Sequence, residues 1–88
     1  MERVVTVVSK EGCHLCERVI SALRSLSSRY GFEVRVLDIL QDRGLHDLYH
    51  LRIPVVRIGD EVVFEAEDMV GTSDCEAQLE PLVSPLAR

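Results

Sequence analysis

The stretch VVSKEGCHLC, residues 7–16, decides the fold that we expect of this 88-residue chain. It continues a run of valines and carries two cysteines, Cys13 and Cys16, separated by two residues. Residues 3–8 are β-branched and nearly all apolar, a composition typical of a strand buried on both faces of a sheet covered by helices. The cysteine pair is therefore expected where a first strand gives way to a first helix.

A helix is predicted after this strand because apolar side chains recur every three or four residues and so share one face. The positions are Cys16, Val19, Ile20, Leu23, Leu26 and Tyr30. Gly31 is a good C-terminal stop for such a helix. Residues 32–39 predict a second strand, because apolar and charged residues alternate over the first five of them. A strand, a helix and a strand in succession imply a parallel, right-handed unit.

The second half of the chain predicts a short helix, a hairpin and a last helix. Residues 42–50 have a helix-like pattern that Gly44 weakens. Two apolar runs, 55–58 and 61–64, flank a Gly-Asp pair suited to a tight hairpin loop. Ser73 and Glu76 have the spacing of a capping box, and the last apolar face, whose end Pro85 is expected to disturb, consists of Leu79, Leu82, Val83 and Leu86.

The order βαβαββα predicts one domain over residues 1–88, with an α/β fold. Parallel and antiparallel strands would share one small, four-stranded mixed sheet flanked by helices. A C-x-x-C pair beside such a unit points to the thioredoxin class. The order of the strands across the sheet does not follow from the letters.

The two cysteines differ in the chemistry that their positions favour. Cys13 would lie at the start of the helix, where unpaired backbone N–H groups and the helix dipole favour a thiolate, so it is the predicted nucleophile. Cys16, one turn into the helix, is the predicted resolving thiol. A pair of core or zinc-binding cysteines is the alternative. A structural zinc site needs four ligands, and beyond the pair the chain offers only Cys75, His14, His46 and His50.

Pro54 precedes the third predicted strand, where a trans proline within the sheet would remove a ladder hydrogen bond. A cis Ile53–Pro54 bond in a turn is the prediction, and an ordinary trans proline at the first position of the strand is the alternative. Cys75 in the first turn of the last helix is interpreted as a small, partly buried residue, with a regulatory thiol as the other reading.

Three segments resemble glutaredoxins. VVSKEGCHLC resembles their strand, serine, lysine and C-x-x-C segment, IPVV at 53–56 their cis-proline segment, and VGTSD at 70–74 the glycine-and-aspartate start of their last helix. The chain is similar, over essentially its whole length, to small glutaredoxin-like proteins with C-x-L-C and R-I-P-V motifs. The resemblance implies a thioredoxin-like fold of the glutaredoxin type.

The resemblance also implies a site and an activity. By carry-over, glutathione is held by Lys10, Ile53, Gly71, Thr72, Ser73 and Asp74, and His14, Leu15 and Pro54 complete the expected substrate-binding set. His14 either stabilises a neighbouring thiolate when protonated or is an exposed spacer. The expected protein is a thiol–disulfide oxidoreductase that reduces protein or glutathione mixed disulfides.

The electron source that we expect is glutathione or a thioredoxin-type reductase, with no bound cofactor and no metal. A metal or iron–sulfur carrier that uses the same cysteines is the alternative function.

The composition of the chain indicates which classes of binding partner and which cellular compartment to expect. Acidic residues outnumber basic ones by 15 to 10, giving a formal charge of −5, which argues against nucleic acid as a partner. The apolar stretches are strand-sized, far shorter than the roughly 20 residues of a membrane span, and we expect no signal peptide. Three cysteines are an odd number and few for a secreted scaffold. A cytoplasmic monomer is expected.

Overall fold

The valine run forms the central strand of the sheet in the computed structural model, which describes residues 3–69 and 74–87. This strand, β1 (Val4–Ser9), pairs in parallel with β2 (Glu33–Asp38) on one side. On the other side it pairs antiparallel with β3 (Val55–Ile58), which in turn pairs with β4 (Glu61–Glu65). The order across the sheet is β2-β1-β3-β4, so the prediction of a mixed four-stranded sheet is confirmed.

Strands β3 (Val55–Ile58) and β4 (Glu61–Glu65) are joined by the Gly-Asp loop that the sequence predicted. Their pairing is irregular between Val56 and Arg57, where the register shifts. The hairpin places β4 at one edge of the sheet, and β2 forms the opposite edge.

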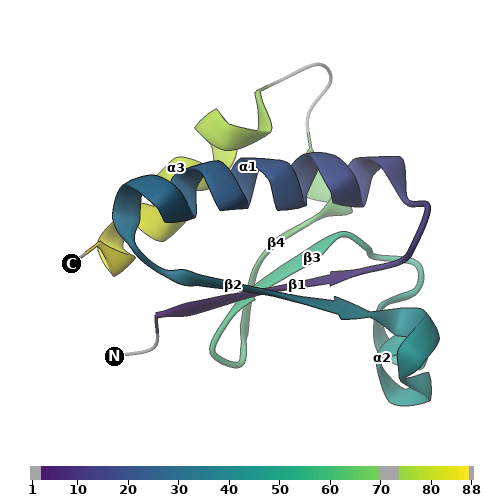
Figure 1. Ribbon diagram of the computed structural model, residues 1–88. Helices are drawn as coiled ribbons and strands as arrows, with labels where there is room; N and C mark the ends of the chain where they lie inside the picture. The colour runs from purple at the N-terminus through teal and green to yellow at the C-terminus, as the bar shows by residue number, and fades with distance from the viewer. Residues whose placement is uncertain (1–2, 70–73, 88) are drawn as a thin grey trace.

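In the part of the chain that the structure describes, the α-helices are α1 (His14–Tyr30), α2 (Arg43–Tyr49) and α3 (Cys75–Val83). Helices α1 and α3 cover the same face of the sheet, and α2 lies beyond one end of it (Figure 1). The predicted α/β fold, with a mixed sheet flanked by helices, is thus confirmed. Among the helices of the described residues, none is long and apolar enough to cross a membrane.

Helix α1 begins after Cys13 and ends at Gly31, as its sequence predicts. The Gly31 backbone is left-handed, with φ of 80°, and its N–H donates to the Ser27 carbonyl at 2.8 Å. Glycine adopts this conformation without the steric cost that a Cβ atom brings. The buried face of the helix consists of Cys16, Val19, Ala22, Leu23 and Leu26.

Alternation along β1 divides the core between two clusters. Val7 packs into the main cluster, which joins the sheet to α1 and α3, and Val8 packs into a smaller cluster with Ile39, Tyr49 and Val55. Both valines are fully buried. The prediction that this strand is buried on both faces is therefore correct at its carboxyl end, where the cysteine loop begins.

The observed ends of three elements differ from the sequence predictions. Strand β1 runs one residue further than predicted, to Ser9, which is within the usual scatter of element ends. Ile39 leaves the second strand and begins a 3-10 turn, because the Asp38 carboxylate accepts a hydrogen bond from the Leu40 N–H at 2.7 Å.

The last helix starts at Cys75, and its N-cap is Asp74, whose carboxylate accepts from the Glu76 N–H at 2.9 Å. The expected cap, Ser73, lies outside the described residues. Aspartate caps a helix as well as serine does, so the capping-box spacing placed this start one residue too early. The helix ends at Val83 and a 3-10 turn over Ser84–Leu86 contains Pro85, as expected.

Candidate functional site

A tight turn connects β1 to the cysteine pair. The backbone N–H of Cys13 donates to the Lys10 carbonyl at 3.0 Å, which closes a turn through Glu11 and Gly12. Gly12 adopts a left-handed backbone with φ of 83°, a conformation that residues with a Cβ atom rarely adopt. The chain therefore reverses sharply at the end of the central strand, and Cys13 directly precedes α1.

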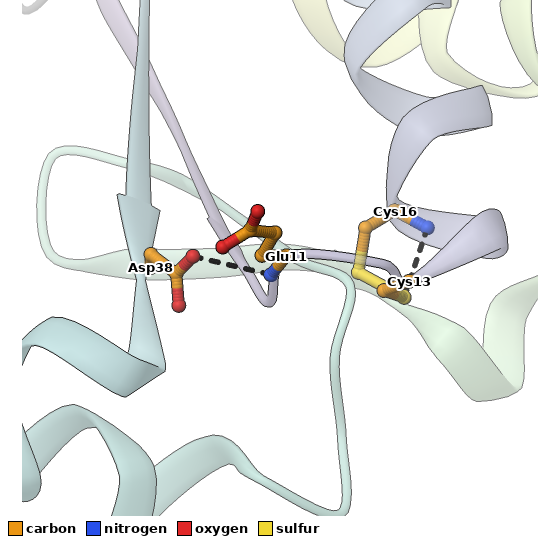
Figure 2. The surroundings of a disulfide bond; sticks show 4 residues. All are labelled: Glu11, Cys13, Cys16 and Asp38. Carbon is orange, nitrogen blue, oxygen red and sulfur yellow. Dashed lines mark hydrogen bonds between the residues drawn. A yellow bond between two sulfur atoms is a disulfide. The ribbon is translucent and has the colours of Figure 1, made fainter.

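Cys13 is the N-cap residue of α1, and its side chain performs the capping. Its Sγ atom accepts a hydrogen bond from the backbone N–H of Cys16 at 3.2 Å (Figure 2). The two sulfur atoms form a disulfide, and the Cα atoms lie 5.2 Å apart, within the usual range of about 4.4–6.8 Å. The geometry thus allows the two residues to pass between a dithiol and a disulfide in place.

The two cysteines differ in exposure. Cys13 is half-buried, whereas Cys16 is 1% exposed and belongs to the apolar face of α1. In the reduced protein, the N–H that points at the Cys13 sulfur and the positive end of the helix dipole both stabilise a thiolate there. Cys13 is therefore the more accessible of the two sulfurs.

Asp38, which the sequence reasoning did not identify, anchors the cysteine loop. Its Oδ2 atom accepts from the backbone N–H of Glu11 at 3.1 Å (Figure 2). Its Oδ1 atom accepts from the backbone N–H of Leu40. Ser9 and Asp38 are paired at the carboxyl ends of β1 and β2. Adjacent parallel strands bring their carboxyl ends to one edge, and this rule was the signal that could have placed Asp38 beside the loop.

The Ile53–Pro54 bond is cis, as predicted, and Pro54 is fully buried. Val55 follows it and pairs with Val8 in the antiparallel register of β1 and β3. Pro54 therefore lies at the end of the sheet from which the cysteine loop departs. Ile53, the other residue of this bond, is half-buried.

A bidentate ion pair holds the segment ahead of this proline. Arg52 donates to both carboxylate oxygens of Glu65 at 3.0 and 2.9 Å, and the Arg52 carbonyl accepts from the Ala66 N–H at 3.2 Å. The hydrogen bond from Arg52 lowers the pKa of the Glu65 carboxyl from its ordinary value of 4.5. The pair ties the end of β4 to the chain entering the cis bond.

His14 and Asp74, two of the predicted site residues, are brought together by a groove of about 710 Å³ between α1 and the start of α3. The remaining lining residues are Glu17, Arg18, Ser21, Ala22, Ser25, Cys75 and Glu76. Cys75 is buried at the groove and is not part of a disulfide.

Of the other predicted contact residues, some are exposed near Cys13 and some lie outside the described residues. Lys10 and Leu15 are exposed on either side of Cys13, and neither lines the groove. Gly71, Thr72 and Ser73 lie outside the described residues. Leu15, with 40% of its surface exposed, gives the cysteine pair an apolar neighbour at the surface.

Comparison with known proteins gives one family and several structures. The family model described as the glutaredoxin-like domain (DUF836) matches residues 4–80. A solution structure of a protein from Nitrosomonas europaea is 31% identical, with a TM-score of 0.65 over 89% of this chain and 92% of that one.

Two further structures share the fold at lower identity. A protein from X. campestris is 23% identical, with a TM-score of 0.63 over 88% of this chain and 96% of that chain. The germline-specific thioredoxin Deadhead of Drosophila melanogaster is 21% identical, with a TM-score of 0.57 over 96% of this chain and 80% of its own. No curated protein gives a significant match.

Proposed function

Because the chain belongs to the glutaredoxin-like domain family, we propose that it is a thiol–disulfide oxidoreductase that acts through Cys13 and Cys16. The observation that carries the proposal is the unequal setting of the two sulfurs. Cys13 caps α1 and is partly exposed, whereas Cys16 is buried one turn further along the helix. A nucleophile has to meet its substrate, and a resolving thiol has to meet only the nucleophile.

The reaction proceeds in two exchanges. The Cys13 thiolate attacks one sulfur of a substrate disulfide, which forms a mixed disulfide and releases the other sulfur as a thiolate that takes up a proton. Cys16 then gives up its proton and attacks the Cys13 sulfur, which forms the intramolecular disulfide and releases the second substrate thiol. The substrate gains two electrons and two protons, and the protein dithiol is oxidised.

The proposed substrates are disulfides of proteins or mixed disulfides with glutathione. Exposed His14 and Leu15 lie between the two cysteines in the chain, so they are available to contact a bound substrate. We assign glutathione binding to Lys10, to the backbone beside Pro54 and to Asp74 at the start of α3. Two molecules of glutathione, or a thioredoxin-type reductase with NADPH, would restore the dithiol.

The experiment starts from fully oxidised protein. Reduction of the Cys13–Cys16 disulfide is followed by mass spectrometry after thiol trapping, with reduced glutathione in one arm and a thioredoxin reductase with NADPH in the other. Cys75→Ser is the matched control and should behave as the wild type. Faster reduction by one donor assigns the protein to that redox class.

Two results would overturn the proposal. In the first, neither donor reduces the Cys13–Cys16 disulfide, and the protein does not reduce a small disulfide substrate. The other is an iron–sulfur absorption band in anaerobically purified protein that disappears in Cys13→Ser, which would favour a carrier function for the same cysteines.

A further inference from the structure

Two histidines form a stacked pair at the C-terminal end of α2, the helix that carries no predicted site residue. His46 and His50 are four residues apart, and their ring centroids lie 4.6 Å apart with an angle of 5° between the planes. The His50 backbone N–H donates to the His46 carbonyl at 2.9 Å, so the helical turn extends to His50. Both side chains therefore project from the same face of the helix.

Contacts at the Nδ1 atoms favour one tautomer of each neutral ring. His50 Nδ1 lies 2.8 Å from the His46 carbonyl oxygen, which only accepts, so this nitrogen carries the proton. His46 Nδ1 lies 3.3 Å from the Asp47 carboxylate, which likewise accepts. In the neutral rings, the lone pair on each Nε2 is therefore the one available to a ligand.

This arrangement matches the one that metal-binding histidines use. A ligating imidazole commonly donates its second ring N–H to a carbonyl or a carboxylate, which fixes the tautomer and orients the ring. Two histidines at positions i and i+4 of a helix are also the ligand spacing of zinc-binding helices. The segment His46-Asp47-Leu48-Tyr49-His50 supplies both features.

The surroundings of the pair favour a cation. The side chains of His46 and Asp47 are 45% and 68% exposed, so an ion reaches them from solvent. The pair lies at the C-terminal end of α2, where helix carbonyl groups leave a partial negative charge. The chain as a whole carries a formal charge of −5.

We propose that His46 and His50 bind one divalent transition-metal ion through their Nε2 atoms, with water completing the coordination. Binding requires the two rings to turn out of their parallel stack, so that both Nε2 atoms face the same ion. Imidazole ligands suit copper, nickel and zinc, and copper binds most tightly in this series. This site is separate from the cysteine pair and does not depend on the proposed redox function.

The site differs from a structural or catalytic zinc centre in its number of protein ligands. Across residues 3–69 and 74–87, no group of three or more His, Cys, Asp and Glu side chains is placed to hold a metal ion. Structural zinc sites use four protein ligands and catalytic ones use three. A two-histidine site accordingly exchanges its ion readily and leaves coordination positions open to water.

The test titrates Cu²⁺ and Zn²⁺ into oxidised protein, in which Cys13 and Cys16 are not available as thiolates. Calorimetry should show one ion per chain, and His46→Gln and His50→Gln should each weaken binding by on the order of tenfold or more. His14→Gln is the matched control, because this exposed histidine lies outside the pair, and it should leave the affinity unchanged. Circular dichroism confirms that each variant remains folded.

A second readout locates the ion in the wild-type protein. Paramagnetic broadening by Cu²⁺ in amide NMR spectra should centre on α2. Wild-type affinity in both pair variants, loss of binding in His14→Gln, or broadening centred on the cysteine loop would each overturn the proposal. Asp47→Ala adds a check on ring orientation: affinity should fall roughly tenfold while the stoichiometry remains one.

Discussion

At the scale of single residues, helix periodicity determines which of the two cysteines is buried and which is partly exposed. Cys16 shares the apolar face of α1 with Val19 and Leu23, and all three are buried in the core. Cys13 stands just before the first turn of the helix, where its sulfur accepts a backbone N–H in place of a conventional capping oxygen. The three-residue separation of Cys13 and Cys16 thus places a partly exposed sulfur next to a buried one.

The first prediction concerns the acidity of Cys13 in the reduced protein. The helix N-terminus and the Cys16 N–H should hold the pKa of the Cys13 thiol below the ordinary value of about 8.5. Brief iodoacetamide treatment near neutral pH should therefore label Cys13 first, as read by mass spectrometry. Lys10→Ala removes a nearby positive charge and should raise that pKa modestly, which would slow the labelling.

The buried thiols are the internal comparison for this measurement. Cys16 and Cys75 are 1% and 7% exposed and should react slowly in both proteins. Labelling that falls first on either of them would show that Cys13 is not the activated thiol.

At the scale of secondary-structure elements, the ends of α1 are determined by two residues, Cys13 and Gly31. The second prediction is that Gly31→Ala destabilises the protein by about 1–2 kcal/mol, because the left-handed backbone at this position is costly for a residue with a Cβ atom. Chemical denaturation measures the change. Ser28→Ala, at an exposed position in the same helix, is the control and should change stability by less than about 0.5 kcal/mol.

An effect of similar size in both variants would mean that helix propensity, not the backbone conformation at Gly31, dominates. That result would contradict the role assigned to Gly31 in ending α1.

The third prediction concerns the ion pair that joins β4 to the cis-proline segment. Because Arg52 lowers the pKa of Glu65 below 4.5, the stabilising contribution of the pair is present above pH 4.5. It is lost as the pH falls from there through the folded-state pKa. Melting temperatures measured from pH 7 to pH 3 should fall less steeply below pH 4.5 in Glu65→Gln than in the wild type.

Above pH 5 the same variant should melt at a lower temperature than the wild type, because Arg52 loses its charged partner. Parallel curves for the two proteins across the whole range would show that the pair contributes nothing to the pH dependence of stability.

At the scale of the whole molecule, one core joins the sheet to α1 and α3. Leu23 is fully buried in it, so the fourth prediction is that Leu23→Ala costs about 2–5 kcal/mol in urea unfolding. Leu48→Ala removes the same side chain from a position that is 65% exposed. This control should cost less than about 0.5 kcal/mol. Equal losses would contradict the assignment of the core.

Local patterns in the sequence were sufficient to predict the elements. The valine run, the helix that ends at Gly31 and the Gly-Asp hairpin each follow from the chemistry of neighbouring residues, and the structure confirms them. The cis bond at Pro54 was also predicted from its place before a strand. Element ends were less accurate: Asp38 caps a 3-10 turn that ends the second strand early, and Asp74 caps the last helix one residue after the expected cap.

Features that depend on which elements become neighbours were not predicted from the sequence. Asp38 contacts the cysteine loop because β2 lies beside β1; the predicted parallel unit allowed this contact, but the order of the strands across the sheet could not be derived from the sequence. The groove that joins His14 to Asp74 likewise requires α1 and α3 to pack on one face of the sheet. Such contacts are set by packing between distant segments and leave no local pattern.

The most direct test of the redox proposal is a trapping experiment with two single variants. Cys16→Ser removes only the resolving thiol, so this variant should accumulate a mixed disulfide on Cys13 when it meets a disulfide substrate or oxidised glutathione. Cys13→Ser should form no such adduct on Cys16 and should lose disulfide reduction. Intact-mass spectrometry under non-reducing conditions identifies the adducts, and equal capture by both variants, or by neither, would contradict the assignment of Cys13 as the nucleophile.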